Sequence, residues 1–333
     1  MVTIKDVART SGFSIATVSA VINNAPIVSK EAREKILQAI DELGYKPNYI
    51  ARSLKSAKTN TIGVLMRGNK NAFYAELISE IEEVAWKNGY TVFVCNIQDQ
   101  PDREKKYIEK MLEKRVDGII ISTVLVDRPD YLTEIAKQNV PFVFLNRKPD
   151  NLLEDEIYVG SNNQLASEIG VEYLNKLGYN KIAFMASNQQ YSTFRDRKRG
   201  FIKAMDSYQI PIVNDWLVTM EDSQENGSEY IKKLIKDRNL PDAIFCCTDS
   251  LAFGVYRELI DSGYRIPEDV ALLSIDNSPL SSLINLTTID VNSRKMGGLS
   301  CETLIKMIKE KNTNIDQKIV NLEPTLIIRN TCD

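Results

Sequence analysis

The first 45 residues carry apolar side chains at the three-to-four-residue spacing of amphipathic helices. One run begins after Thr3, and Asp6, three residues later, is placed to complete a capping box. Gly12 ends this run, since glycine readily takes the left-handed conformation of a helix C-cap. Ser14 is a good cap for a second helix that extends to Asn23, and a third amphipathic run, capped by a serine, follows. The pattern predicts a small, all-helical head whose first two helices are joined by a tight turn.

The second of these helices has two unlike faces. One face carries Val18, Val21 and Ile22, which are spaced to pack inward. The opposite face carries small or hydrogen-bonding residues: Ala16, Thr17, Ser19, Ala20 and Asn23. Such a face fits closely into the major groove of DNA. An ordinary helical hairpin at the start of a globular chain has the same pattern, so the hairpin alone leaves both interpretations open.

From residue 61 onward, short apolar runs of strand length alternate with longer amphipathic runs. The expected strands are 62–66, 90–95, 117–121, 142–145, 181–185, 243–247, 270–275, 318–322 and 325–329. The expected helices are 72–87, 102–114, 131–138, 164–177, 195–207, 225–237, 250–261 and 293–309. Near-continuous apolar strands between helices indicate parallel sheets covered on both faces. We therefore predict an α/β body of two lobes, with a ligand cleft at the carboxyl ends of the strands.

The head and the body are joined by a short basic segment that begins at Pro47. Its helical run, from Asn48 to Lys55, is too short to be stable alone in water, where roughly 12–15 residues are needed. The segment is either a linker or a helix that orders on binding.

Charge is unevenly distributed between these parts. Residues 1–60 contain nine Lys/Arg against five Asp/Glu, and the remainder contains 33 against 40, which gives net charges of +4 and −7. A basic end on an acidic body favours a nucleic-acid contact confined to the N-terminus. Chance variation in a 60-residue window gives a similar imbalance, so charge alone does not decide the matter.

Composition argues against several other classes of protein. The chain has no histidine, which removes Ser-His-Asp and Cys-His mechanisms and the usual zinc sites. No phosphate-binding glycine loop stands at a strand–helix junction, so we expect neither an enzyme nor a cofactor or metal. The five cysteines lack metal-ligand spacing, and those at 95, 246 and 247 lie in apolar runs, which indicates reduced, buried thiols and a cytoplasmic protein. No signal-peptide core or membrane-length apolar run is present.

Several short segments together resemble the lactose/galactose repressor (LacI/GalR) family of bacterial transcription regulators. They are TIKDVA (3–8), SIATVS (14–19), VS (28–29), LGYKPN (43–48), ARSL (51–54), VDGII (116–120), TD (248–249), IPEDV (266–270) and LTTI (286–289). The resemblance implies a helix-turn-helix head, a hinge helix and a two-lobed, periplasmic-binding-protein-like effector domain. The expected boundaries are 1–46 for the head, 47–60 for the hinge and linker, 61–160 plus 291–322 for the first lobe, and 161–290 plus 323–333 for the second lobe.

The resemblance also assigns DNA contacts. In the head they are Thr3, Ser14, Ile15, Ala16, Thr17, Ser19, Ala20 and Asn23, and in the hinge they are Asn48, Ala51, Arg52 and Leu54. Ala20 departs from the family, which usually has arginine there, so the preferred operator is left open. Arginine pairs bidentately with guanine, whereas alanine offers only an apolar contact such as one to a thymine methyl. Leu54 matches an intercalating leucine, which would kink the minor groove; the alternative is that it packs within the hinge.

The same resemblance assigns an effector site between the lobes. Its residues are Phe73, Tyr74, Tyr191, Arg197, Asp222, Thr248, Asp249 and Asp276. Carboxylates and arginine bind hydroxyl pairs, and an aromatic ring covers the apolar face of a sugar. The alternative to ligand contact for Phe73 is a place in the hydrophobic core. Asp222 falls near a position where relatives often carry an aromatic residue, which implies a more polar ligand or one covered by Tyr191 instead.

We therefore expect a sequence-specific transcriptional regulator, a repressor controlled by a small metabolite, with a sugar or sugar derivative favoured. It would bind a pseudo-palindromic operator as a homodimer. Three alternatives remain: control by a phosphoprotein corepressor, a solute-binding protein without a DNA role, and an enzyme built on the two-lobed fold. The basic helical head opposes the second alternative, and the missing histidine and phosphate loop oppose the third.

Overall fold

The computed structural model describes residues 2–23, 25–46, 58–68, 72–98, 100–310 and 317–333. The chain forms two compact units, Met1–Thr59 and Asn60–Asp333, here called the head and the body. The predicted hinge residues Asn48, Ala51, Arg52 and Leu54 lie outside the described residues.

The head contains α1 (Ile4–Ser11), α2 (Ile15–Ile22) and α3 (Lys30–Glu42). Their ends are set by local hydrogen bonds: the Ser14 hydroxyl accepts from the Thr17 backbone N–H at 3.1 Å, and Gly12 takes a φ of 76°. The head has its own core of Val7, Val18, Val21, Ile36 and Ala39. Leu37, although apolar, is 50% exposed, because it lies about 100° around the helix from the buried Ile36.

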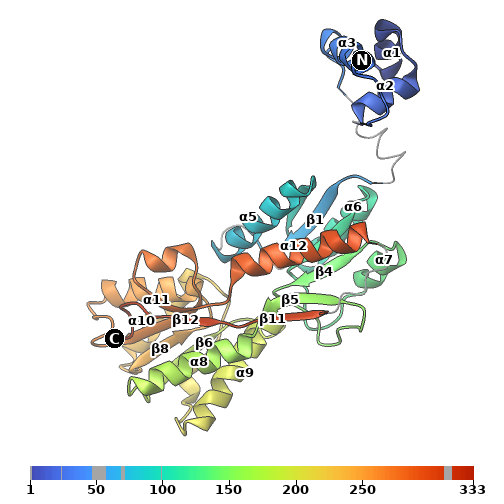
Figure 1. Cartoon of the computed structure of the whole chain (residues 1–333). Coiled ribbons are helices and arrows are strands. Elements are labelled where there is room, and N and C mark those ends of the chain that lie inside the picture. The colour runs from blue at the N-terminus through green and yellow to red at the C-terminus, as the bar shows by residue number, and fades with distance from the viewer. Residues whose placement is uncertain (1, 24, 47–57, 69–71, 99, 311–316) are drawn as a thin grey trace. The chain divides into compact units, whose positions relative to one another are not determined.

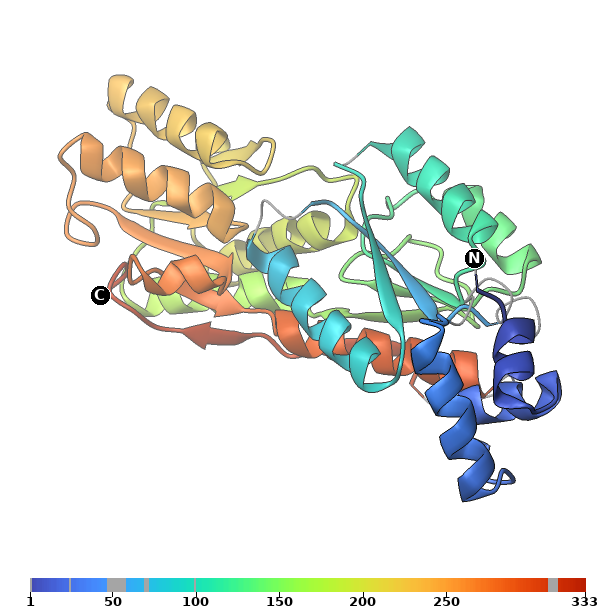
Figure 2. The same cartoon turned by 90° about the horizontal axis from the view of Figure 1, so that it is seen from above.

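The first sheet of the body has the strand order β11-β5-β4-β3-β1-β2, and its neighbouring strands are parallel. Its strands are β1 (Thr61–Met66), β2 (Thr91–Asn96), β3 (Gly118–Ile121), β4 (Phe142–Leu145), β5 (Ile157–Ser161) and β11 (Ile319–Leu322). Helices α5 (Ala72–Lys87) and α12 (Ser293–Lys309) run side by side over one face (Figures 1 and 2). Helices α6 (Pro101–Glu113) and α7 (Tyr131–Lys137) cover the other face.

The second sheet has the order β12-β10-β9-β8-β6-β7. Its strands are β6 (Ile182–Ala186), β7 (Leu217–Thr219), β8 (Ala243–Cys246), β9 (Ala271–Asp276), β10 (Thr287–Asp290) and β12 (Thr325–Ile327). Its helices are α8 (Asn163–Lys176), α9 (Ser192–Ser207), α10 (Gln224–Lys236) and α11 (Asp249–Asp261), with short 3-10 turns at Asn214–Trp216 and Pro279–Ser282. Helices α8 and α9 pack together as one pair, and α10 and α11 as another.

The chain passes between the two sheets three times, after β5, after β10 and after β11. The last passage is so short that β12 enters the second sheet antiparallel to β10, whereas purely parallel sheets were expected. Because every crossover helix lies against a sheet face, the carboxyl ends of β1, β4, β7, β8 and β9 are left for loops.

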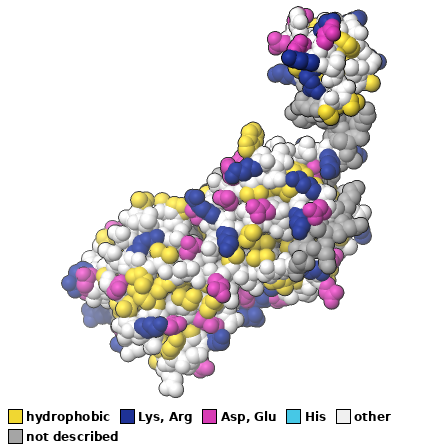
Figure 3. Space-filling view, in the orientation of Figure 1, with side chains coloured by type: hydrophobic (Ala, Val, Ile, Leu, Met, Phe, Trp, Pro, Cys, Tyr) yellow, Lys and Arg dark blue, Asp and Glu magenta, His cyan; other side chains and the backbone are white. Residues whose placement is uncertain are grey.

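Burial agrees with this layered arrangement. All five cysteines are free and buried, as their apolar settings predicted for Cys95, Cys246 and Cys247. Lys/Arg and Asp/Glu side chains are interspersed over the face of the body shown in Figure 3. On that face, the charge of the body is therefore not gathered into a patch of one sign.

Candidate functional site

The outward face of α2 has the surface expected of a recognition helix. Ser14, Ile15, Ala16 and Asn23 are exposed, and Thr17, Ser19 and Ala20 are partly exposed. The hydroxyl oxygens of Ser14 and Thr17 lie 2.9 Å apart, and the Asn23 amide donates to the Ser19 hydroxyl at 3.4 Å. The face is thus small, uncharged and rich in hydroxyl groups, so a groove can approach its backbone closely.

Thr3 lies at the start of α1 and is exposed. Its backbone N–H donates to the Asp6 carboxylate at 2.9 Å as part of the predicted capping box, and its hydroxyl donates to the same carboxylate at 2.7 Å. Asp6 is in turn paired with Arg9 at 2.8 Å, and these contacts hold the pKa of Asp6 below its usual value, with the Thr3 hydrogen bonds as the main cause. Thr3 therefore has a local capping role besides any role toward DNA.

In the body, side chains from the ends of strands in both sheets meet in one buried group, which we call the inner cluster. Its members are Arg67, Phe73, Tyr74, Asn146, Arg147, Thr193, Phe194, Arg197, Asp222, Thr248 and Asp276. Arg67 follows β1, Asn146 and Arg147 follow β4, Asp222 follows β7, and Asp276 ends β9. The convergence of strand ends is the physical basis of ligand sites in parallel α/β sheets.

Asp222 links the two sheets. Its carboxylate accepts from the Arg67 guanidinium at 2.5 Å and from the Thr248 hydroxyl at 2.6 Å. The side chains of Arg67 and Asp222 are 17% and 1% exposed. An ion pair as buried as this one is stable only when the two charged groups are well oriented and hydrogen-bonded. Removing one partner leaves the other charge in a poorly hydrated place. The bridge therefore joins the segment after β1 to the segment after β7.

Arg197 and Asp276 form a second buried ion pair, with 2.9 Å between their charged atoms. Arg197 also donates to the Asn163 side chain at 2.9 Å. Burial raises the pKa of the Asp276 carboxyl above its usual value, and the Arg197 charge opposes this rise. Asp276 also has a φ of 131°, a conformation that costs about 1–3 kcal/mol and is typical of functional sites.

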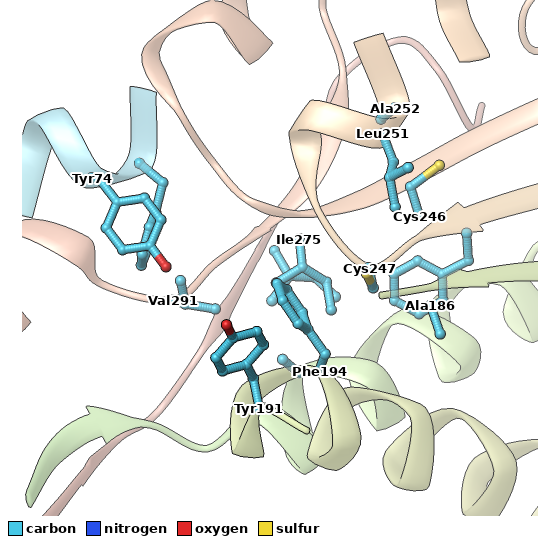
Figure 4. Packing of buried hydrophobic residues seen from close by; sticks show 14 of the residues in the cluster. Tyr74, Ala186, Tyr191, Phe194, Cys246, Cys247, Leu251, Ala252, Ile275 and Val291 are labelled. Atoms are coloured by element: carbon cyan, nitrogen blue, oxygen red, sulfur yellow. The ribbon is translucent and has the colours of Figure 1, made fainter. Parts of the chain in front are cut away.

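Aromatic side chains complete the inner cluster. Phe73 and Tyr74 are buried and pack edge to face, with ring centroids 5.3 Å apart. Tyr74, on α5, and Tyr191, at the start of α9, approach Val291 with their hydroxyl groups turned toward it (Figure 4). The guanidinium of the buried Arg147 lies 3.6 Å from the centre of the Tyr191 ring. Stacking of this kind favours arginine over lysine, because the guanidinium is planar and weakly hydrated.

A larger, open cavity of about 590 Å³ adjoins the inner cluster, and we call it the outer cavity. It is lined by Arg67, Ser187, Asn188, Gln189, Tyr191, Phe194, Thr219, Met220, Glu221 and Asp222. The inner cluster itself encloses only about 10 Å³. Arg67, Phe194 and Asp222 line both spaces, so the Arg67–Asp222 bridge lies at the boundary between them.

The structure brings most of the predicted effector residues together and sets one apart. Phe73, Tyr74, Arg197, Asp222, Thr248 and Asp276 line the inner cluster, and Tyr191 lines the outer cavity. Asp249 lines neither. Its carboxylate accepts from the Ser274 hydroxyl, the Ser278 backbone N–H and the Thr288 hydroxyl at 2.5, 2.7 and 2.8 Å, so these hydrogen bonds give it a structural role inside the second lobe.

Four residues of the inner cluster were not predicted from the sequence: Arg67, Asn146, Arg147 and Thr193. Arg67 follows an apolar strand directly, and Arg147 comes two residues after one. A polar residue just after an apolar strand was the signal used for Thr248 and Asp276, and it would also have found these two arginines.

The chain combines a helical head, whose outward helix is uncharged, with a body that holds a polar site between two sheets. This is the organisation of a ligand-responsive transcription regulator. Residues 3–48 match the family described as bacterial regulatory proteins, lacI family. Residues 59–327 match periplasmic binding proteins and the sugar binding domain of the LacI family. The chain belongs to the LacI family and is a DNA-binding transcriptional repressor, which confirms the resemblance and the predicted fold.

Individual relatives cover nearly the whole chain. The chain is 34% identical to the HTH-type transcriptional repressor PurR of Photobacterium profundum, over 99% of this chain and 98% of that protein. The lac repressor dimer bound to operator and the anti-inducer ONPF is 28% identical, with a TM-score of 0.89 and 99% of each chain covered. A LacI family regulator from Enterococcus faecium with bound ribose is 27% identical, with a TM-score of 0.71 over 81% of this chain and 98% of that one. Within the described residues, no helix is long and apolar enough to cross a membrane.

Proposed function

We propose that this repressor is controlled by a small metabolite, a sugar or sugar derivative, that binds in the outer cavity and the inner cluster. The observation that carries the proposal is the Arg67–Asp222 bridge, which joins the ends of strands from both sheets at the boundary of a 590 Å³ cavity. A ligand bound at that point contacts both lobes and so changes the free-energy difference between their arrangements. The ribose bound to the Enterococcus faecium relative supports a carbohydrate as the ligand.

The chemistry of the lining supports the same ligand class. The carboxylate of Asp222 and the amides of Asn188 and Gln189 line the outer cavity and suit sugar hydroxyl groups. Tyr191 and Phe194 offer ring faces for the apolar side of a sugar ring. A cavity of this size lies within the range of roughly 300–1,000 Å³ typical of small-molecule sites.

On the DNA side, we propose that α2 lies in the major groove. Ser14, Thr17, Ser19 and Asn23 would contact phosphates and bases, whereas Ile15, Ala16 and Ala20 would set sequence preference through apolar contacts. Two copies of the chain would bind the two halves of a pseudo-palindromic operator, since two-fold protein symmetry is mirrored in the DNA. The operator-bound dimer of the lac repressor supports this assembly.

Selection of binding sites from a random duplex library tests the proposal. The selected sites should be pseudo-palindromes, and the affinity for them should fall steeply as salt rises from about 50 to 200 mM, because phosphate contacts release counterions. A chain lacking residues 1–58 should lose this binding, since the body alone lacks the recognition helix. Full operator affinity in the shortened chain would contradict the assignment of α2.

A further inference from the structure

The exposed face of α2 carries three alkyl side chains and two polar side chains that contact each other. At about 100° per residue, the face spans roughly 140° of the helix surface, in the order Ile15, Ser19, Asn23, Ala16 and Ala20. All five residues are exposed or partly exposed. The Asn23 amide donates to the Ser19 hydroxyl at 3.4 Å. The other three residues present only alkyl groups.

Ile15 takes no part in the core of the head. Its side chain is 45% exposed. Among the described residues of the head, it belongs neither to the core nor to the apolar side chains packed against the core. A single exposed apolar side chain is common on protein surfaces. Here two alanines lie on the same face, so an apolar surface extends over more than one helical turn.

The positive charge of this part of the chain lies elsewhere. All nine Lys/Arg of residues 1–60 are outside α2. Contacts between such side chains and phosphates supply affinity and position a protein on DNA, but they carry no sequence information. The reading of base edges is therefore left to the neutral face of α2.

The side chains of α2 lack the groups that read three of the four bases. Arginine and lysine pair with guanine, asparagine and glutamine with adenine, and aspartate and glutamate with cytosine. None of these residue types occurs between Ile15 and Ile22. Asn23 follows the last turn of α2, whereas the N-terminal residues of a recognition helix contact base edges. Thymine is the base that presents an apolar group, its C5 methyl, in the major groove.

Building on the proposed DNA contact of α2, we infer that this repressor reads its operator through thymine methyl groups, which Ile15, Ala16 and Ala20 contact in the major groove. The short alanine side chains let the backbone of α2 approach the bases, and Ile15 adds the largest apolar surface at the first turn. The base pairs that face α2 are A·T pairs in a defined orientation, because only thymine carries the methyl group.

Deoxyuridine tests this inference, because it differs from thymidine only by the missing methyl group. Each thymine of the operator selected from the random library is replaced in turn, and the affinity of the full chain is measured by fluorescence anisotropy. At one or more thymines per half-site the affinity should fall about four-fold, and about fifteen-fold when both half-sites are changed. The loss should be equal at about 50 and 200 mM salt, because a methyl contact releases no counterions.

Two substitutions connect the methyl groups to α2. Ile15→Ala should largely remove the deoxyuridine penalty at one thymine of each half-site and leave the other penalties in place. Ala20→Arg should change the base selected at one position from thymine to guanine, because arginine pairs bidentately with guanine. Arginine is also a good helix former, so this variant should fold.

Leu37→Ala is the matched control. Leu37 is 50% exposed, lies on α3 of the same head and, like Ile15, is not among the described residues that form or cover the core. This variant should keep every deoxyuridine penalty. Loss of a penalty in Leu37→Ala as well would overturn the assignment to α2.

The outcomes separate this inference from the proposed function. A pseudo-palindromic operator that requires residues 1–58 but tolerates deoxyuridine at every thymine would overturn the inference, and the proposed function would stand. The same holds if 7-deazaguanine, which removes the N7 acceptor of guanine, lowers the affinity where deoxyuridine does not. If no pseudo-palindrome is selected at all, the proposed function fails and the inference fails with it.

Discussion

Arg197 was predicted to contact the effector, but the structure also gives it internal partners. It lies between Asp276, at 2.9 Å, and the Asn163 side chain, at 2.9 Å, and is almost inaccessible to water. A charge that is almost fully buried stabilises the fold only while its oppositely charged partner is present. Arg197 therefore holds α9 to the start of α8 and to the end of β9, and it presents Asp276 to the ligand site.

Replacing Arg197 should reveal this structural role. Arg197→Met leaves the Asp276 carboxyl buried without its cation, and we expect the free energy of unfolding to fall by about 3–5 kcal/mol. Urea denaturation measures the change. Arg199→Met is the matched control on the same helix; its side chain is 63% exposed, so its effect should stay within about 0.5 kcal/mol. A double variant, Arg197→Met/Asp276→Asn, should recover part of the loss, and similar effects for the two single variants would contradict this role.

Among the helices, close packing fixes where the loops of the site begin. A Cβ atom added at Gly254 of α11 would lie 1.8 Å from the carbonyl oxygen of Gln224, so α10 and α11 meet backbone to backbone. Asp222 stands just before the Ser223 cap of α10. The approach of the two helices therefore sets the position of Asp222 relative to Arg67.

Gly254→Ala should destabilise the protein by about 1–3 kcal/mol, because the added methyl group forces the two backbones apart. It should also weaken effector binding, because Asp222 moves with α10. Gly298→Ala in α12 is the control: its nearest neighbour would be the flexible Glu80 side chain at 3.3 Å, and alanine favours a helix by about 1 kcal/mol over glycine. Thermal unfolding compares the two, and equal stability of the variants would show that the helices can separate at little cost.

For the whole molecule, the question is how ligand binding in the body reaches DNA. Besides the Arg67–Asp222 bridge, the Thr193 hydroxyl donates to the Asn146 carbonyl at 2.8 Å, so the segment after β4 is also joined to the first turn of α9. A ligand that alters these contacts shifts the arrangement of the lobes and thereby changes the affinity of the protein for its operator. By thermodynamic linkage, operator binding changes the affinity of the protein for the ligand by the same factor.

The hinge is the expected carrier of this coupling, and Leu54 tests it. If Leu54 is a wedge in the minor groove, Leu54→Ala should weaken operator binding sharply and leave effector affinity in the DNA-free protein nearly unchanged. Anisotropy with labelled operator and calorimetry with the effector provide the two measurements. Unchanged operator affinity would remove Leu54 from the mechanism, and a lost effector site would mean that the substitution damaged the fold.

Much of the architecture could be predicted because its causes lie within a few residues of one another. Capping by Thr3 and Ser14, the left-handed turn at Gly12 and the apolar stripe of each long helix depend on neighbours one helical turn away. Strands β5, β7 and β10 escaped prediction, since their sequences IYVGS, LVT and TTID mix apolar residues with small or polar ones. Strand β7 matters most, because Asp222 follows it.

The sequence by itself determined which polar residues end up beside apolar strands, but only the tertiary structure decided which of them meet. Thr248 and Asp249 are neighbours in the chain, yet one contacts Asp222 in the site and the other is enclosed by hydrogen bonds from β9, β10 and the loop after β9. Arg67 and Asp222 are 155 residues apart and belong to different sheets. Their pairing depends on the order of the strands and on three passages of the chain between the sheets, which no local pattern of residues encodes.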